Sequence, residues 1–454
     1  MEPRQVRTAA DARRILQERG LRHVKVGVHD IDGILRGKYL HIDKFSSALD
    51  GGMGFCDVVL GWDSNDQLYD NVTYTGWHTA YPDANVRILP DTCREIATEP
   101  GNLLFLCEFV DKAEEICPRG TLRRVLDRAA NLGFEVKVGF EYEFFVFAET
   151  AFSIREKGFK NLKPISPGFF GYSMLRNSVL SDWYRDLLAM CETMDMGIEG
   201  LHTETGAGVL EAALRVKDGL PAADSAALFK LYTKVLAQKR DWLATFMAKW
   251  SKDWPGCGGH MHMSLWKGGR SVFHDDAGPH RMSETMRHFV GGQRALMPEL
   301  LAMVANNVNS YRRLIPGFWA PTVASWGAEN RTTSLRVIPG SAKSTRVEYR
   351  IAAADANPYL ALAAAVGSGL WGIENKVDPG EPIKGNSYEI EHPEKAQLPR
   401  TLMEAAGRLK DSRAARDLFG DAFVDHYSAT REWEEREFRK AITEWELDRY
   451  MEII

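Results

Sequence analysis

The chain has 454 residues, of which 57 are Lys or Arg and 62 are Asp or Glu, so its formal net charge is −5. A chain of this length usually divides into at least two domains, and its 44% hydrophobic and 26% charged residues are typical of a folded globular protein. The slight acidity makes the chain a poor candidate for a general nucleic-acid binder, which needs positive charge to neutralise phosphates, and leaves small anionic ligands open where basic residues cluster.

Cysteine usage and the N-terminal segment indicate the compartment. The six cysteines are irregularly spaced and form no C-x-x-C pair, so we expect reduced, mostly buried thiols rather than disulfides or a zinc site. Residues 1–20 carry five Arg and no apolar core, which predicts an amphipathic helix and not a signal peptide. The longest uncharged apolar stretch, residues 359–373, is too short to span a bilayer. We therefore expect a cytoplasmic protein with no membrane partner.

Short strand-like segments separated by turn signals fill the chain up to about residue 112. Asp32-Gly33 is a hairpin-turn signal between two of them. The expected strands lie at 24–28, 35–42 and 103–107. From residue 117 onward, longer helices alternate with strands. The change predicts two domains: a small β-rich domain over 1–114 and a large α+β domain over 115–454.

Apolar spacing predicts several long helices in the second domain. The first is expected over 122–132, with Thr121 as its N-cap and Gly133 as its stop. Further helices are expected at 181–196, 222–247, 283–309 and 355–375, and in several pieces over 412–451.

The clearest pattern in the chain is a strand over Phe134–Val146. Apolar side chains occupy one face at a period of two, whereas Glu141 and Glu143 share the other face, about 7 Å apart at Cα. Adjacent carboxylates repel each other unless cations lie between them. The strand is therefore either a solvated face or part of a metal site.

Three further segments combine an apolar back with an ionisable front. Their ionisable residues are His260, His262 and Ser264 in 258–265, Arg346, Glu348 and Arg350 in 344–351, and Glu199, Glu204 and Glu211 around a glycine turn in 199–211. Four unrelated strands with solvated faces would also give this pattern. Because four such segments occur together, we favour a sheet that curves around a charged channel.

The residue types at these positions narrow the chemistry. Carboxylates with one or two imidazoles suit hard divalent ions, Mg²⁺ or Mn²⁺, better than structural zinc. A basic group beside such a site suits a nucleoside triphosphate. That group consists of Arg313, Arg331, Arg336, Lys343, Arg346 and Arg350. No Walker A, G-x-G-x-x-G, G-x-S-x-G or H-E-x-x-H motif is present, so dehydrogenase, hydrolase and zincin interpretations lack support.

These segments, in this order, resemble the glutamine synthetase family over nearly the whole chain. The motifs are the E-x-E strand at Glu141 and Glu143, the glutamate–glycine element at 204–211, the G-x-H-x-H strand at 258–262, N-S-Y-R-R-L-I-P-G at 309–317, Asn330-Arg331 with Arg336, R-V-E-Y-R at 346–350 and D-A-N-P-Y-L at 355–360. Each motif is weak alone, but the ordered set is specific. The resemblance implies an N-terminal β-grasp domain, and a catalytic domain with a curved antiparallel sheet and flanking helices. It also implies a homo-oligomer that forms either one ring of six subunits or two such rings stacked, with active sites between neighbouring subunits.

The resemblance also implies roles for individual residues. One divalent ion is expected on Glu143, Glu204 and Glu211, and another on Glu141, His260 and Glu348. ATP contacts are expected from Glu199, His262, Ser264, Arg331, Arg336 and Lys343. Of these, Arg331 and Arg336 also stabilise the phosphoryl charge during catalysis. Glutamate contacts are expected from Gly256, Arg313 and Arg350. The implied reaction is ATP-dependent formation of γ-glutamyl phosphate, followed by attack of an amine.

The residues expected at the amine site differ from those of the family. Ammonia-using members carry a Glu three residues after the Pro of the 309–317 segment, where this chain has Trp319, an apolar and stackable side chain. The family's Asn-Gly pair before the histidine strand is Pro255-Gly256 here. In the N-terminal domain, Cys56 or Asp57 occupies the family's ammonium-site aspartate position, and we assign Asp57 with Trp319 to the amine site.

These departures favour a ligase that joins the γ-carboxyl of glutamate to an organic amine, preferably a bulky or aromatic monoamine. Two other interpretations stay open. One is glutamine synthetase proper, with the missing carboxylate supplied from elsewhere. The other is a catalytically silent relative that serves as a sensor or structural oligomer, although all six metal-ligand candidates are retained.

Overall fold

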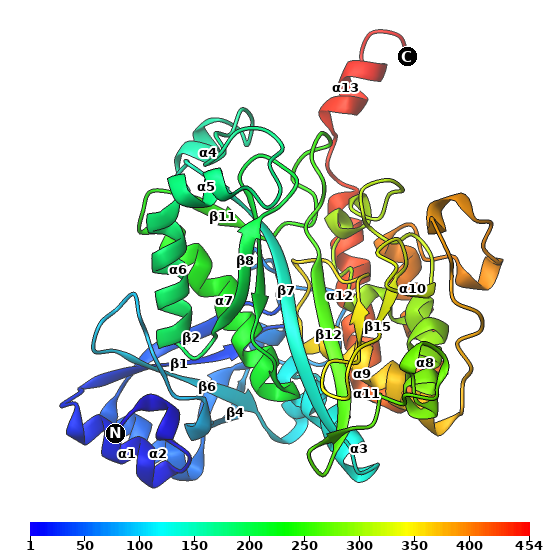
Figure 1. The fold of residues 1–454 in the computed structure, drawn as a ribbon. Coiled ribbons are helices and arrows are strands. Elements are labelled where there is room, and N and C mark those ends of the chain that lie inside the picture. Colours follow the sequence, from blue (N-terminus) through cyan, green and yellow to red (C-terminus); the bar gives the residue numbers. More distant parts are fainter.

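Two β-sheets organise residues 1–454 in the computed structural model (Figure 1). The first contains β1 (His23–His29), β2 (Leu35–His41), β3 (Met53–Cys56), β4 (Asp83–Ile88), β5 (Arg94–Glu95) and β6 (Leu103–Phe109). The second contains β7 (Glu135–Phe147), β8 (Ile198–Thr203), β9 (Val209–Leu214), β10 (Lys217–Asp218), β11 (Leu243–Thr245), β12 (Gly259–Lys267), β13 (Arg270–Ser271), β14 (Trp326–Ala328), β15 (Leu335–Ile338) and β16 (Arg346–Tyr349).

The first sheet has the strand order β2-β1-β6-β4-β3, with β5 paired to β6. β1 and β2 form the expected hairpin, whose turn is closed by the Asp30 carboxylate: it accepts hydrogen bonds from the backbone N–H groups of Asp32 and Ile34. Two helices accompany this sheet, α1 (Ala9–Glu18) and α2 (Ile42–Gly51). α1 was expected, whereas α2 was not. The strand over 35–42 ends at His41, whose side chain caps α2.

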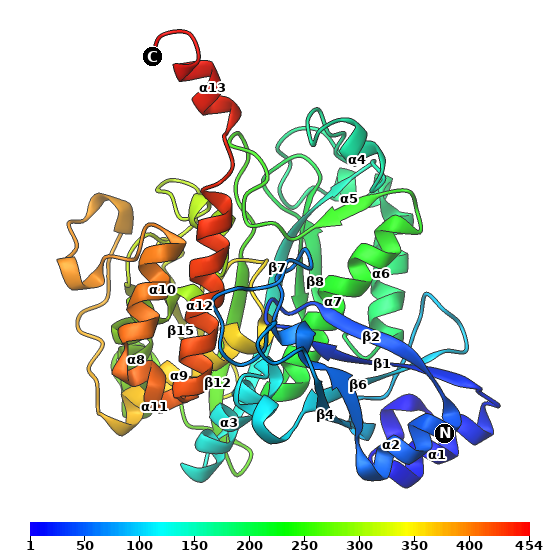
Figure 2. The same cartoon turned by 180° about the vertical axis from the view of Figure 1, so that it is seen from behind.

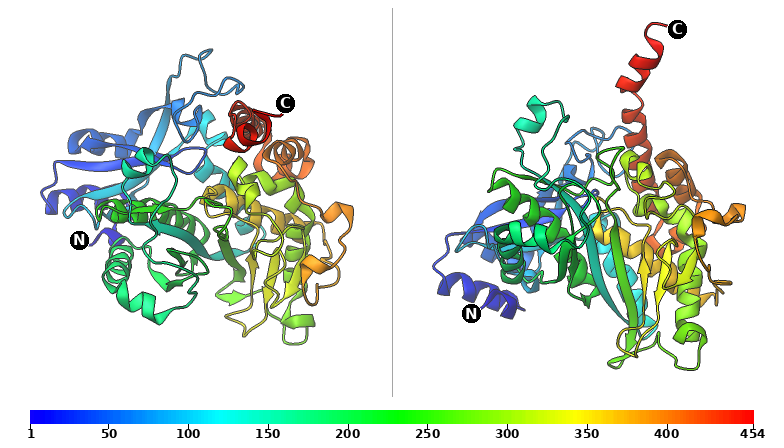
Figure 3. Two further views of the ribbon diagram at one scale, coloured as in Figure 1. Left: turned by 90° about the horizontal axis from the view of Figure 1, so that it is seen from above. Right: turned by 45° about the horizontal axis from the view of Figure 1, so that its top comes forward.

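The second sheet curves, and β7 is its longest strand. Its order is β14-β15-β16-β12-β7-β9-β8, and every pair along this path is antiparallel except β14–β15. β10 and β11 also pair with β7, and β13 pairs with β12. In Figure 3 the sheet lies between the N-terminal elements in blue and the yellow to red helices. The mixed fold with a curved, mainly antiparallel sheet confirms the expected fold class.

Eleven further helices complete the chain. They are α3 (Pro118–Asn131), α4 (Ser153–Glu156), α5 (Met174–Val179), α6 (Ser181–Thr193), α7 (Gly219–Gln238), α8 (Glu284–Leu300), α9 (Pro358–Glu374), α10 (Leu402–Asp411), α11 (Arg413–Phe419), α12 (Asp421–Phe438) and α13 (Glu444–Tyr450). α9 is almost entirely buried. It packs closely on α8 because a Cβ at Gly292 would lie 2.2 Å from the Ser368 carbonyl oxygen. α13 projects from the body of the molecule (Figure 2). No helix has both the length and the apolar composition needed to cross a membrane.

The helices α6, α9 and α11 to α13 confirm the expected helical stretches, but three other predictions were wrong in detail. α3 begins at Pro118 with Cys117 as its N-cap, because proline fits the first helical position, so Thr121 lies inside the helix. The helix expected over 222–247 ends at Gln238, because 243–245 pair with β7. The stretch over 283–309 is helical only to Leu300 and then forms two short 3₁₀ turns.

Buried side chains pack without interruption from one sheet to the other. A buried ion network also connects them, because Arg119 of α3 pairs with Glu108 of β6 and with Asp224 of α7. The domain boundary expected at residue 114 falls between β6 and α3 and stays a prediction. All six cysteines are unpaired and five are buried, as expected.

Candidate active site

The ionisable faces of four strands lie on one side of the second sheet because their register aligns them. Residues directly opposite each other in an antiparallel pair point to the same face. The opposed pairs are Glu141 with His260, Glu143 with Glu211, and His262 with Glu348. Arg336 of β15 stands opposite Glu348 and extends the same row. The period-two prediction for these strands is confirmed.

This face lines a cavity of about 640 Å³. Among the residues predicted for the site, the cavity is lined by Glu141, Glu143, Glu204, Glu211, Gly256, His260, His262, Arg313, Trp319, Arg331, Arg336, Glu348 and Arg350. Arg331 and Arg336 would face opposite ways on a straight strand. Both reach the cavity because Arg331 lies in the bent connection between β14 and β15, where Glu329 has a φ of +51°.

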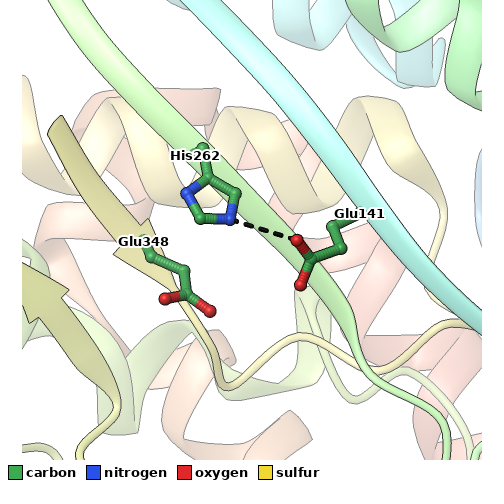
Figure 4. A group of neighbouring side chains, drawn as sticks. All are labelled: Glu141, His262 and Glu348. Atoms are coloured by element: carbon green, nitrogen blue, oxygen red, sulfur yellow. Dashed lines mark ion pairs between the residues drawn. The ribbon is translucent and has the colours of Figure 1, made fainter. Parts of the chain in front are cut away.

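Three overlapping groups of side chains have the geometry of a divalent-metal site, with ligand atoms within 4.8 Å of one another in each group. Their members are Glu141, His262 and Glu348 in the first, Glu141, Glu211 and His260 in the second, and His202, Glu204 and Glu211 in the third. In the first group the three side chains point toward one another from neighbouring strands, with His262 Nε2 3.5 Å from Glu141 Oε2 (Figure 4).

Crowding of carboxylates perturbs their protonation. Burial, together with the charges of Glu141 and Glu143, raises the pKa of Glu211 to about 10. Burial also raises the pKa of Glu143, whose carboxylate accepts a hydrogen bond from the Gly258 N–H. So many buried acids are stable together only if protons or cations neutralise them. Mg²⁺ and Mn²⁺ bind mainly carboxylate oxygens, with an occasional imidazole nitrogen. The residues of this site therefore fit such divalent ions.

Two other carboxylates are held in their charged form. Burial alone would raise the pKa of Glu141, but hydrogen bonds from His260 and His262 hold it well below its usual value. Burial opposes the charge of Glu348 as well, and the adjacent Arg350 guanidinium lowers its pKa. His260 Nδ1 lies 3.1 Å from Glu141 Oε1 and 3.6 Å from Glu348 Oε1, so one imidazole bridges both acids.

Arginines line the same cavity beside the carboxylates, and Arg350 forms an ion pair with Glu348. Arg313 is buried and donates to the carbonyl oxygens of Arg350 and Ile351 at 3.2 and 3.1 Å. Arg350 is buried too, and its Nε has no hydrogen-bond partner. A buried, unpartnered guanidinium N–H beside a cavity fits an anionic substrate group. Gly256 permits the close packing here, because a Cβ would lie 2.5 Å from the Ala248 carbonyl oxygen.

Trp319 forms part of the cavity wall with its indole turned outward. Its side chain is 61% exposed, and its φ is +59°. It also lines a neighbouring cavity of about 490 Å³, together with Ala328, Pro382 and Ile383. The indole therefore lies between two cavities rather than packed beneath the segment that carries it.

Residues 115–450 match the family described as "Glutamine synthetase, catalytic domain". The chain belongs to the glutamine synthetase family. It is 45% identical to Type-1 glutamine synthetase 2 of Dictyostelium discoideum over 95% of this chain and 84% of that protein. It is 36% identical to glutamate–isopropylamine ligase of a Pseudomonas species over 97% of each chain. It is 33% identical to gamma-glutamylethanolamide synthetase GlnA4 of Streptomyces coelicolor over 93% of this chain and 91% of that protein.

A solved structure of a GmaS/ADP complex has the same fold, with a TM-score of 0.84 at 26% identity over 97% of this chain and 99% of that one. The expected family and fold are therefore confirmed. As a member of the glutamine synthetase family, the chain is an ATP-dependent carbon–nitrogen ligase that uses divalent metal ions.

Four predicted residues do not line this cavity. Glu199 is exposed at a bulge in β8, and Lys343 is exposed before β16. Ser264 lies further along β12, where its Oγ accepts a hydrogen bond from Trp266 Nε1 at 2.8 Å. Asp57 is buried beside the first sheet and accepts a hydrogen bond from Thr75 Oγ1 at 2.7 Å, and burial raises its pKa. The roles predicted for these residues, and the choice between Asp57 and the neighbouring Cys56, stay predictions.

His202 and Tyr172 are among the cavity residues that sequence reasoning did not assign to the site. His202 Nε2 lies 3.1 Å from Glu204 Oε1 and 3.4 Å from Glu211 Oε1. Its position two residues before Glu204 on a strand was a usable signal. The Tyr172 ring stacks on His202 with 4.2 Å between centroids. Tyr172 comes from an irregular loop with a φ of +54°, and no pattern in the sequence marks it.

Proposed function

We propose that the chain joins the γ-carboxyl of glutamate to an organic monoamine with a bulky or aromatic substituent, by way of γ-glutamyl phosphate formed from ATP. The observation that carries the proposal is Trp319: an exposed indole stands on the cavity wall at the place where ammonia-using relatives have a carboxylate. Two relatives whose names specify an amine product or substrate, at 36% and 33% identity, support the same conclusion.

The carboxylate face would hold the metal ions. Glu143, Glu204 and Glu211 would hold one divalent ion, Mg²⁺ or Mn²⁺, and Glu141, His260 and Glu348 another. His202 and His262 are additional candidates on the same face. When bound, the ions offset the charge of the phosphate oxygens during phosphoryl transfer.

Arginines and backbone groups would position the two anionic substrates. Arg331, in the connection between β14 and β15, and Arg336 of β15 both line the cavity, where guanidinium groups would stabilise charge that develops on a transferred phosphoryl group. Arg313 and Arg350 line the same cavity, and Arg350 Nε, which has no hydrogen-bond partner, would donate to a glutamate carboxylate. ATP contacts from Glu199, His262, Ser264 and Lys343 belong to the same proposal.

The amine would approach along Trp319. The neighbouring cavity offers apolar atoms from Ala328, Pro382 and Ile383 to a substituent too large for the carboxylate cavity. Its one carboxylate, Glu329, is already bound by Arg336, with Arg336 Nε 3.1 Å from Glu329 Oε2. A polyamine would therefore lack a free acid for its second ammonium, so a monoamine fits better.

The proposal includes a homo-oligomer of six subunits or a multiple of six. Asp57, predicted for the amine site, does not line the cavity of its own chain. It would act in the cavity of a neighbouring subunit, where a carboxylate could accept the proton that the amine releases.

Glutamine synthetase proper is the second candidate, and two observations favour it. The relative at 45% identity is named a glutamine synthetase. Glu329 also lies beside Trp319 in the neighbouring cavity and could replace the missing carboxylate if Arg336 released it. A silent relative is disfavoured because all six candidate metal ligands line one cavity.

Phosphate release from ATP, Mg²⁺ and glutamate tests the proposal across a panel of ammonia, isopropylamine, benzylamine and putrescine, with mass spectrometry of each product. We expect the highest kcat/KM with a branched or aromatic monoamine. Preference for ammonia would replace the proposal with the second candidate, and no turnover with any amine would favour a silent relative. A Glu329→Gln variant separates the first two: it should lower ammonia use only if Glu329 serves as the missing carboxylate.

A further inference from the structure

The segment that carries Trp319 is held in place by few contacts. Residues 316–322 belong to no helix or strand and make no backbone–backbone hydrogen bond. Gly317 and Trp319 have left-handed φ values of +83° and +59°, and a non-glycine residue keeps such a conformation only where its surroundings fix it. On the side that precedes the indole, the Phe318 ring packs beside Lys249, with Nζ 4.3 Å from the ring centroid. Side chains from other parts of the chain must therefore set the position of the indole.

Two side-chain hydrogen bonds reach this segment. The Tyr388 hydroxyl donates to the carbonyl oxygen of Ala320 at 2.9 Å, and Arg350 Nη2 donates to that of Trp319 at 3.5 Å. Ala320 is buried, so its carbonyl oxygen needs a partner within the protein. Burial raises the pKa of Tyr388, which keeps the hydroxyl protonated and able to donate. The shorter of the two bonds therefore fixes the residue directly after Trp319.

The two donors differ in what else they do. Arg350 is also the ion-pair partner of Glu348, and its bond to the Trp319 carbonyl oxygen is longer than the usual upper value of about 3.2 Å. Tyr388 lines neither the carboxylate cavity nor the neighbouring cavity of about 490 Å³. Its bond to the segment therefore does not compete with a substrate.

The backbone that carries Tyr388 is fixed to the wall of the neighbouring cavity. Asn330 Nδ2 donates to the Ile383 carbonyl oxygen at 3.1 Å. The Ser387 N–H donates to Thr332 Oγ1 at 2.9 Å. Asn330, Thr332 and Ile383 line this cavity together with the indole. The hydroxyl of Tyr388 thus connects the segment that carries the indole to the opposite wall of the same cavity.

We propose that Tyr388 is a positioning residue for amine choice, whose hydroxyl holds the Trp319 indole between the two cavities by binding the Ala320 carbonyl oxygen. The inference rests on the proposed function, in which the amine approaches along this indole. Without the hydroxyl, the segment keeps only its contacts with Arg350 and Lys249. Because bound glutamate would also draw on Arg350, the bond from Tyr388 matters most when glutamate occupies its site.

Tyr388→Phe tests the proposal because it removes the hydroxyl and keeps the ring. We expect the ratio of kcat/KM for benzylamine to that for ammonia to fall roughly fivefold, the factor that corresponds to one neutral hydrogen bond. The loss should appear in the KM for benzylamine and not in the KM for ATP, because the indole is placed to contact the amine. In a Trp319→Ala background the same change should not lower the ratio further, since the group that Tyr388 positions is absent.

The matched control is Tyr184→Phe in α6, which removes a buried hydroxyl that has no hydrogen-bond partner. Limited proteolysis with chymotrypsin, which prefers to cleave after aromatic residues, tests the hydrogen bond without turnover. Tyr388→Phe should be cleaved after Phe318 or Trp319 roughly fivefold faster than the wild type and Tyr184→Phe, because cleavage follows the population of the opened segment. Mass spectrometry locates the cleavage, and circular dichroism checks that each variant folds.

A ratio that falls only while Trp319 is present, together with faster cleavage, supports the proposal. An equal fall in the wild-type and Trp319→Ala backgrounds would overturn it, because Tyr388 would then act by another route. Wild-type values of both the ratio and the cleavage rate would overturn it as well, and faster cleavage with an unchanged ratio would refute the role in amine choice. If the wild type prefers ammonia, the proposed function fails, whereas the cleavage rates still show whether Tyr388 holds the segment.

Discussion

Replacement of Trp319 gives the sharpest test of how this enzyme selects its amine. A tryptophan side chain offers roughly 250 Å² of surface, and this one is 61% exposed, so about 150 Å² is free to contact a ligand. A substrate that covers half of it buries about 75 Å², which at about 25 cal/mol per Å² amounts to ~1.9 kcal/mol, or roughly 25-fold in kcat/KM. Trp319→Ala should therefore lower kcat/KM for benzylamine by about 25-fold and leave that for ammonia nearly unchanged.

Trp319→Glu should go further, because a carboxylate attracts ammonium and accepts its proton. We expect the ratio of benzylamine to ammonia use to fall below that of Trp319→Ala. Trp445→Glu is the matched control, since Trp445 is 62% exposed and lies in α13 outside the cavity. Both changes at Trp319 keep a non-glycine residue at a φ of +59°, so backbone strain is the same in each. An unchanged ratio in Trp319→Ala would refute the reasoning, because the indole would then contribute nothing to amine choice.

Three other predictions concern metal, assembly and pH. Glu143→Ala or Glu348→Ala should remove most ATP turnover while circular dichroism stays unchanged, since each deletes a candidate metal ligand on the cavity face. If either variant keeps wild-type turnover, the replaced residue is not a required metal ligand. Light scattering should give a multiple of six subunits, and a stable, active monomer would contradict a site shared between subunits. Burial lowers the pKa of His29 to about 4, and neither ring nitrogen has a partner. Because the unfolded chain binds this proton near pH 6.5 and the folded chain does not, stability is complete above pH 6.5. It falls by up to about 1.4 kcal/mol per unit as the pH drops toward 4. In urea unfolding, the free energy of unfolding of His29→Phe should fall less steeply between pH 6.5 and 5 than that of the wild type. Equal slopes of this free energy against pH would count against a neutral buried His29.

The sequence by itself determined the charged faces of the sheet. A strand alternates its side chains with a period of two, so the local order of residues around Glu141, His260 and Glu348 decides which of them share a face. Each apolar back must be buried, which leaves the ionisable front toward the cavity. The family followed from the order of these segments along the chain, and that order needs no three-dimensional information.

Only the tertiary structure decided which residues complete the site and where several elements end. Helical spacing continues past Gln238, but α7 stops there because 243–245 pair with β7, a contact remote in sequence. The irregular loop that places Tyr172 over His202 follows no periodic pattern, so it left no signal in the sequence. The outward position of Trp319 depends on a left-handed backbone conformation in a turn. Likewise, Arg331 and Arg336 reach one cavity only because the connection between β14 and β15 bends, and such a bend is a property of the fold and not of the order of residues along the chain.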